Sequence, residues 1–160
     1  MKPFKLFLDC DGVLADFDTM FTNIAGRHPR GFEEEHGSGP FWKIITKCEG
    51  GFFTQLDKMP DADILVVATN HLNPTILTGI PNGSWSINQK LSWRMENYPF
   101  LNMTCCASKD KKLAMDTNCT NVLVDDWTKY QSTWEEAGGI FVLHTSAEDS
   151  IRQLKELGVI

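Results

Sequence analysis

The sequence predicts an α/β protein, a doubly wound sheet of about five mainly parallel strands with helices on both faces. Two observations lead to this prediction. Short apolar runs recur along the 160-residue chain, and several of the segments between them have helical spacing. The runs also lack strict alternation of polar and apolar residues, which is typical of strands buried on both faces.

The runs expected to form strands are rich in Val, Leu, Ile and Phe. They are residues 5–9 (KLFLD), 63–69 (DILVVAT), 103–107 (MTCCA), 121–126 (NVLVDD) and 139–145 (GIFVLHT). Helices are expected over residues 88–98, 128–139 and 146–158. In the first of these, Leu91, Met95 and Tyr98 share one stripe, and Ser146 can cap the last.

Residues 18–60 break the alternation of strands and helices. This segment contains helical pieces, then a Gly/Pro-rich patch (GSGPFW), then GGFF. We expect a single domain over residues 1–160, with a core of residues 1–17 and 61–160 and a small, mostly helical cap inserted at about residues 18–60.

Composition restricts the class of protein and its partners. The chain is 42% hydrophobic and 22% charged, which is ordinary for a soluble globular protein, and no apolar run reaches the ~18–20 residues of a membrane span. We therefore expect a cytoplasmic protein without a membrane partner. The five cysteines show no C-x-x-C spacing, which argues against a disulfide framework and a structural zinc site.

The net charge further restricts the classes of molecule that the protein is expected to bind. A formal charge of −6 argues against binding to extended nucleic acid but is compatible with a small anionic substrate held by a metal ion. The oligomeric state stays open, with a homodimer among the possibilities.

Two pairs of aspartates follow expected strands. Asp9 and Asp11 come after the first strand, and Asp125 and Asp126 end the fourth. The carboxyl ends of parallel strands form the ligand-binding edge of an open α/β sheet. Residues two apart in an extended segment point the same way, and Gly12 permits a sharp turn behind them. Converging carboxylates without His or Cys suit Mg²⁺.

A magnesium site with a spare carboxylate suits phosphoryl transfer. One aspartate can attack phosphorus while another carries the proton, and the metal offsets the phosphate charge. Other interpretations exist for each pair alone. D-x-D-G also occurs in calcium loops, although Val13 replaces the acid that an EF-hand needs, and Asp125–Asp126 can cap a helix. Two pairs at strand ends favour the metal site.

The motifs resemble those of the haloacid dehalogenase-like (HAD) hydrolases. DCDGVLADF is similar to their first motif, VVATN to the second, a lysine of SKDKK to the third and VLVDD to the fourth. Within the superfamily, the pieces DGVLADF, GPFW, GFFTQLDKMPDA and SKDKK resemble the 5'(3')-deoxyribonucleotidases. This resemblance implies a Mg²⁺-dependent phosphatase, a 5'-nucleotidase of nucleotide metabolism, that hydrolyses a (deoxy)nucleoside monophosphate through an aspartyl-phosphate.

The resemblance also implies residue roles. Asp9 would be the nucleophile and Asp11 the acid/base. The metal-binding residues would be Asp9, Asp11 through its backbone carbonyl, Asp125 and Asp126. The substrate-binding residues would be Phe17, Phe41, Trp42, Lys43, Thr69, Asn70 and Lys111.

Several alternatives remain open at this point. Asn70 and His71 stand where the family has a Ser-Pro pair, and the long gap before VLVDD leaves Lys109 and Lys112 as alternatives to Lys111. Aromatic residues of a small cap can also form its own core instead of contacting a base. The same chemistry can act on a polynucleotide 3'-phosphate or a sugar phosphate. A third possibility is a binding module without catalysis.

Overall fold

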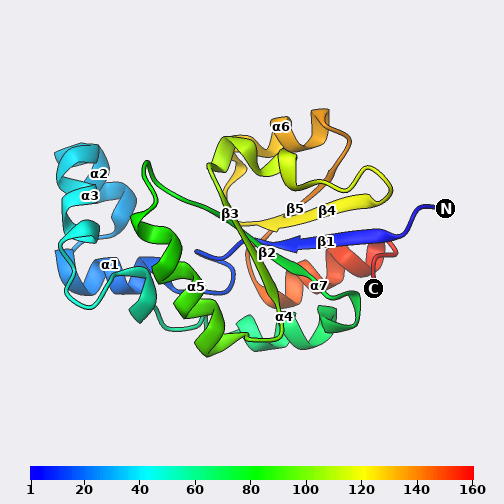
Figure 1. The fold of residues 1–160 in the computed structure, drawn as a ribbon, viewed down its shortest axis with the longest axis horizontal. Helices are drawn as coiled ribbons and strands as arrows, with labels where there is room; N and C mark the ends of the chain where they lie inside the picture. Colours follow the sequence, from blue (N-terminus) through cyan, green and yellow to red (C-terminus); the bar gives the residue numbers. More distant parts are fainter.

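The computed structural model describes residues 1–160 and contains one five-stranded parallel sheet, shown in Figure 1. The strands are β1 (Phe4–Leu8), β2 (Thr75–Gly79), β3 (Asn102–Cys106), β4 (Thr120–Asp125) and β5 (Ile140–Leu143). Their order across the sheet is β3-β2-β1-β4-β5, and every neighbouring pair is parallel. The expected fold class, a parallel α/β sheet with helices, is confirmed.

Helices cover both faces of this sheet. One face packs against α4 (Ala62–Thr69), α5 (Trp85–Asn97) and α7 (Ala147–Glu156), which lie together in Figure 1. The other face is covered more thinly, by the short α6 (Gln131–Glu136) and the 3₁₀ segment η3 (Ser108–Ala114). Strands between two helical layers bury both faces, which explains why their sequences are continuously apolar. No helix of the structure has the length and apolarity needed to cross a membrane.

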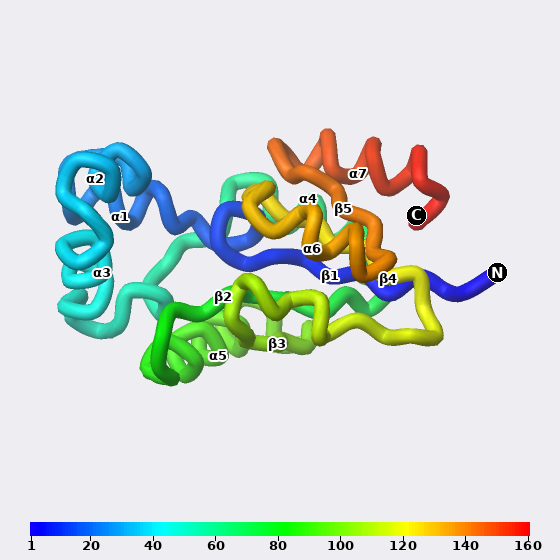
Figure 2. Tube along the Cα trace, turned by 90° about the horizontal axis from the view of Figure 1, so that it is seen from above, coloured from blue at the N-terminus to red at the C-terminus, as the bar shows by residue number.

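The segment after β1 forms a separate group of helices. It contains α1 (Phe17–Ala25), α2 (Pro29–His36), α3 (Ser38–Thr46) and the 3₁₀ turn η1 (Phe53–Gln55), and we call it the helical insert. Figures 1 and 2 show α1, α2 and α3 side by side at one end of the molecule, beyond the carboxyl end of β1.

The helical insert is tied to the rest of the molecule at its base. The Trp93 indole N–H of α5 donates to the carbonyl of Leu56 at 2.7 Å, and the amide of Phe53 donates to Gln89 Oε1 at 3.0 Å. Asp16, the third aspartate of the motif DCDGVLADF, accepts from the amide of Thr19 at 3.1 Å and so caps α1. These contacts fix where the insert begins and ends relative to the sheet.

One expected strand is a helix. Residues 63–69 belong to α4, and the second strand of the sheet is instead residues 75–79 (TILTG). A short apolar run without clear period fits a strand and a packed helix equally well. In α4 the apolar residues Ile64 and Val67 are 59% and 77% exposed, so the run is not buried on both faces. The parallel pairing of β1 with β2 also requires a crossover, which this helix supplies.

The expected stripe of Leu91, Met95 and Tyr98 on α5 is only partly right, because Tyr98 is buried in the core but Met95 is not. Met95, placed on the stripe with Leu91 and Tyr98, is 59% exposed. The helix instead buries Ser86, Lys90 and Trp93. Hydrophobic periodicity counts serine and lysine as polar, so it assigns this buried face to solvent.

The remaining elements follow the sequence closely. The other four expected strands are present with bounds that differ by one or two residues. Ser146 caps α7 as expected, accepting from the amide of Asp149 at 3.1 Å.

Candidate active site

The two acid pairs meet at the centre of the sheet. β1 and β4 are neighbours, and their register aligns Leu8 with Val124, so Asp9 and Asp125 come next to each other at the carboxyl end. From β1 the chain continues to β2 on one side, while β4 lies on the other side. This is a topological switch point, where open α/β sheets form a ligand-binding crevice.

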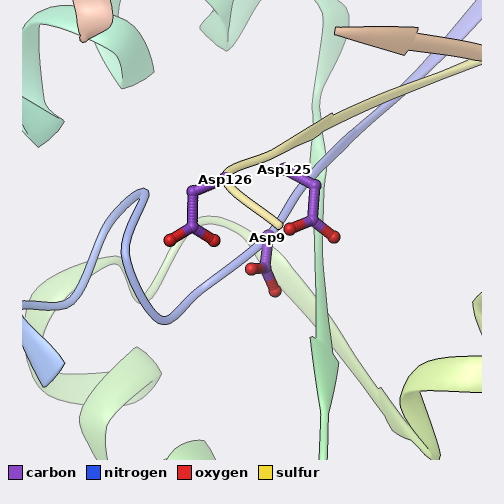
Figure 3. Close-up of side chains that lie close together, drawn as sticks. All are labelled: Asp9, Asp125 and Asp126. Carbon is purple, nitrogen blue, oxygen red and sulfur yellow. The ribbon is translucent and has the colours of Figure 1, made fainter. Parts of the chain in front are cut away.

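Three carboxyl groups converge at this point, as Figure 3 shows. Carboxylate oxygens of Asp9, Asp125 and Asp126 lie within 4.8 Å of one another. Asp9 and Asp125 are buried, and Asp126 is more open to solvent. The Lys111 ammonium lies 2.9 Å from Asp9 Oδ1 and 2.8 Å from Asp125 Oδ2. One ammonium against three carboxylates leaves an excess of negative charge.

Burial and this excess of negative charge shift the pKa values of the site. Burial raises the pKa of Asp9 well above its ordinary range, and Asp125 and Asp126 add to this while Lys111 opposes it. Burial and the neighbouring Asp125 raise the pKa of Asp126 to about 7. Burial opposes the charge of Lys111, but Asp9 and Asp125 outweigh it and raise the pKa of the ammonium. The cluster therefore favours an additional cation or proton.

The donor set of the cluster fits Mg²⁺. It offers hard carboxylate oxygens from Asp9, Asp125 and Asp126, without histidine or cysteine, and Mg²⁺ prefers such ligands. Gly12 leaves room for this arrangement. Its φ is +83°, and a Cβ added there would collide with the carboxylate of Asp126. The turn glycine is thus needed both for its backbone conformation and for the position of one acid.

Asp11 lies outside this cluster. Its Oδ2 is 2.7 Å from the ammonium of Lys90, a residue of α5 that is only 2% exposed. Lys90 also donates to Thr78 Oγ1 at 3.0 Å and lies over the ring of Phe53 at 4.2 Å. Burial alone would lower the pKa of Lys90, but the Asp11 carboxylate outweighs it and the net pKa is raised. Lys90 is therefore a buried cation paired with Asp11.

The acids open into a cavity of about 320 Å³, a size typical of small-molecule sites. Asp9, Asp11, Lys111, Asp125 and Asp126 form its charged part. The helical insert and the loops above the sheet supply aromatic side chains, which are Phe17, Phe41, Trp42, Phe53, Trp127 and Tyr130. The insert also places Asp18, Arg30 and Glu33 in the lining, so the wall that faces the acid cluster is partly aromatic and partly charged.

Most of the residues chosen from the sequence meet in this cavity. Asp9, Asp11, Asp125, Asp126, Lys111, Phe17, Phe41 and Trp42 all line it. Lys109 and Lys112 line it as well, but they are exposed, whereas Lys111 is 8% exposed and contacts the acids. Lys111 is therefore the lysine that the fold brings to the cluster.

Thr69, Asn70 and Lys43 are elsewhere, which corrects their expected placement. Thr69 is fully buried, and its Oγ1 donates to the carbonyl of Leu65 at 2.8 Å within α4. Because α4 leads into the start of β2, Thr69 and Asn70 belong to the edge of the sheet opposite the acids. Lys43 lies in a shallow groove on the insert with Ile44 and Lys47, outside the cavity.

Several site residues were missed from the sequence. Thr78 and Gly79 end β2 beside β1 and occupy the place that the misread strand gave to Thr69. The signal was a β-branched run between Pro74 and Pro81. Lys90 gave no signal, because a lysine in a helix is usually solvated. Trp127 is 44% exposed, and its amide donates to Asp125 Oδ1 at 3.0 Å.

Comparisons with solved structures identify the fold. A HAD-superfamily hydrolase from Ehrlichia chaffeensis superposes with a TM-score of 0.62 and 13% identity over 98% of both chains. Hydrolases from Streptococcus pneumoniae TIGR4 (TM-score 0.49, 16% identity, 100% of both chains) and Pseudomonas syringae (TM-score 0.43, 15% identity, 98% and 99%) are more distant in structure. Neither the models of protein families nor the curated proteins give a match. The chain has the fold of a HAD-superfamily hydrolase.

Proposed function

We propose that the protein is a phosphomonoesterase that hydrolyses a (deoxy)nucleoside monophosphate, in the manner of the 5'(3')-deoxyribonucleotidases. One observation carries this proposal. Asp9, in contact with Lys111, lies at one end of a cavity to which the helical insert and the loops contribute several aromatic side chains. A phosphate fits the end at Asp9 and Lys111, and a base fits the aromatic side chains.

The chemistry divides between the two aspartates of the first motif. A carboxylate oxygen of Asp9 attacks phosphorus and forms an aspartyl-phosphate, while the ester oxygen leaves with a proton from Asp11. Asp11 then takes a proton from water, and the resulting hydroxide attacks the same phosphorus. This step releases inorganic phosphate, frees Asp9 and restores the proton of Asp11.

The remaining polar residues of the site bind the substrate charge. Lys111 supports the phosphate through its ammonium, which already spans Asp9 and Asp125. Asp9, Asp125 and Asp126, with the backbone carbonyl of Asp11, would hold Mg²⁺, which when bound offsets the charge of the phosphate and of the carboxylates.

The helical insert would act as the cap that selects the substrate. It contributes Phe17, Phe41 and Trp42 to the cavity, and these flat apolar faces suit a nucleobase better than a sugar. Phe41 is 7% exposed and packs against Phe21 at 4.9 Å between ring centroids, so it supports the wall from behind. Trp42 is more open and is the better candidate for contact with a base.

The test is phosphate release in Mg²⁺ from a panel of deoxynucleoside and ribonucleoside monophosphates, sugar phosphates and a 3'-phosphorylated oligonucleotide. We expect the highest kcat/KM with a nucleoside monophosphate. A clear preference for a sugar phosphate or for the oligonucleotide would replace the proposed substrate but keep the phosphatase. Asp9→Asn should abolish release from every compound, because an amide does not attack phosphorus. Release that persists in Asp9→Asn would remove the proposed nucleophile.

A further inference from the structure

Lys90 is the buried charge that the proposed reaction leaves unexplained. It comes from α5, whose other inward residues, Ser86 and Trp93, pack in the core. Burying an ammonium is costly unless it is paired and hydrogen-bonded. Here Asp11 Oδ2 and Thr78 Oγ1 accept two of its three N–H donors, and the Phe53 ring covers it. The partners are thus satisfied within the protein, before any ligand arrives.

Lys90 does not reach the cavity, which separates its role from that of Lys111. Asp11, Gly79 and Lys111 line the cavity, whereas Lys90 and Thr78 do not. A bound phosphate can therefore contact Lys111 directly, but Lys90 is separated from it by Asp11. Any effect of Lys90 on the reaction must pass through the carboxyl group that it holds.

The two oxygens of Asp11 are in different situations. Oδ2 is bound to Lys90 at 2.7 Å, whereas Oδ1 is buried without a hydrogen-bond partner. An unpaired buried oxygen is costly and is seldom kept without a use. The side chain as a whole is 28% exposed and lines the cavity, so the carboxyl group that Lys90 holds is the one that faces the substrate site, although Oδ1 itself is covered.

From these contacts we infer that Lys90 is a positioning residue for proton transfer. It holds the Asp11 carboxyl group through Oδ2, with Thr78 fixing the ammonium from the other side, so that this group stays at the cavity where the leaving group and water would meet it. This inference rests on the proposed phosphatase function, because it names the residue that positions its acid/base.

The first experiment compares Lys90→Met with the wild type on two substrates. On a nucleoside monophosphate, kcat should fall about 10- to 100-fold, the range expected when a reacting group is misplaced by a remote change. KM should stay nearly constant, because Lys90 does not contact the cavity. On p-nitrophenyl phosphate, whose leaving group needs little protonation, the loss should be much smaller. A raised KM, or equal losses on both substrates, would overturn the inference.

A double-mutant cycle tests whether Lys90 acts through Asp11. Adding Lys90→Met to Asp11→Asn should cost little further activity on the nucleoside monophosphate, since the group being positioned is already gone. A further loss of about tenfold, which would mean independent action, would overturn the inference. The double variant removes both partners of the ion pair, so this comparison holds even where Lys90→Met alone does not fold. Lys155→Met, at an exposed lysine of α7, is the matched control and should leave both rates unchanged.

A crystal structure of Lys90→Met, or of Thr78→Val where the first does not fold, provides a readout that needs no activity. We expect the Asp11 carboxyl group to leave its present position. A carboxyl group that stays in place would overturn the positioning role. Absence of phosphate release by the wild type would instead refute the proposed function, while the position of Asp11 in the variant would still decide the role of Lys90.

Discussion

Replacing Trp42 with alanine tests whether the aromatic part of the cavity wall recognises a base. Trp42 is half-buried on α3, lines the cavity, and lies edge-to-face against Phe41 at 5.2 Å between ring centroids. The side chain thus has two surfaces, one packed in the helical insert and one facing the cavity. Its removal can act on the substrate, on the insert, or on both.

The two effects differ in size and in substrate dependence. Loss of a stacking aromatic costs about 1–3 kcal/mol per base. At 1.4 kcal/mol per factor of ten, kcat/KM for a nucleoside monophosphate should fall about 5- to 150-fold. A fully buried tryptophan would cost about 3–5 kcal/mol of stability on truncation, and the half-buried Trp42 should cost less. Loss of packing lowers the melting temperature and does not distinguish between substrates.

The assay therefore pairs kcat/KM for the nucleoside monophosphate with kcat/KM for p-nitrophenyl phosphate and with thermal unfolding. The nucleotide rate should fall and the p-nitrophenyl phosphate rate should stay nearly constant. Lys43→Ala is the matched control, because Lys43 is the next residue of the same helix, is exposed and lies outside the cavity. Equal losses on both substrates with a lower melting temperature would show that Trp42 is a core residue of the insert, and base recognition would lose its main support.

Three further predictions concern the acids and the corrected motif. Exhaustive metal removal should abolish phosphate release and Mg²⁺ should restore it, because the acid cluster repels a phosphate dianion; full activity in EDTA would refute this. Since the pKa of Asp126 rises from 3.8 to about 7 on folding, the folded chain binds more protons than the unfolded chain between these values. Unfolding in EDTA should therefore show stability falling as pH rises across this window, with a weaker dependence in Asp126→Asn; stability that rises with pH would contradict it. Thr69→Val should keep near-normal kcat/KM and cost about 0.5–1.5 kcal/mol of stability, since the hydroxyl only bonds within α4. A large loss of kcat with unchanged stability would return Thr69 to the site.

The acid cluster of Asp9, Asp125 and Asp126 could be predicted because its formation depends on few assumptions about the fold. Asp9 and Asp125 each follow an apolar run, and parallel strands bring such positions to one edge of the sheet. The two acids reach this edge whatever the exact length of each strand and whatever the order of the other strands in the sheet. The adjacency of β1 and β4, which places the two acids next to each other, came only with the structure.

The second motif could not be predicted for a physical reason. Residues 62–69 are apolar enough for a buried strand, and periodicity over so short a run does not separate strand from helix. The wrong assignment of this run also led to the wrong placement of Thr69 and Asn70, because their expected role depended on a strand that ends there. The true strand ends at Gly79, directly after Thr78. One wrongly assigned element thus placed Thr69 and Asn70 at the end of the second strand, where the structure has Thr78 and Gly79.

Lys90 shows a different limit of prediction from sequence patterns. Charge and periodicity both assign a helical lysine to solvent, and the energy that holds Lys90 inside comes from Asp11, which is 79 residues away in the sequence. The D-x-D spacing places Asp9 and Asp11 near one cavity, as expected, yet the structure gives them different partners. Lys111 holds Asp9 within the acid cluster, and Lys90 holds Asp11 apart from it. Two carboxylates so close in sequence can serve different steps because two lysines from different elements separate them.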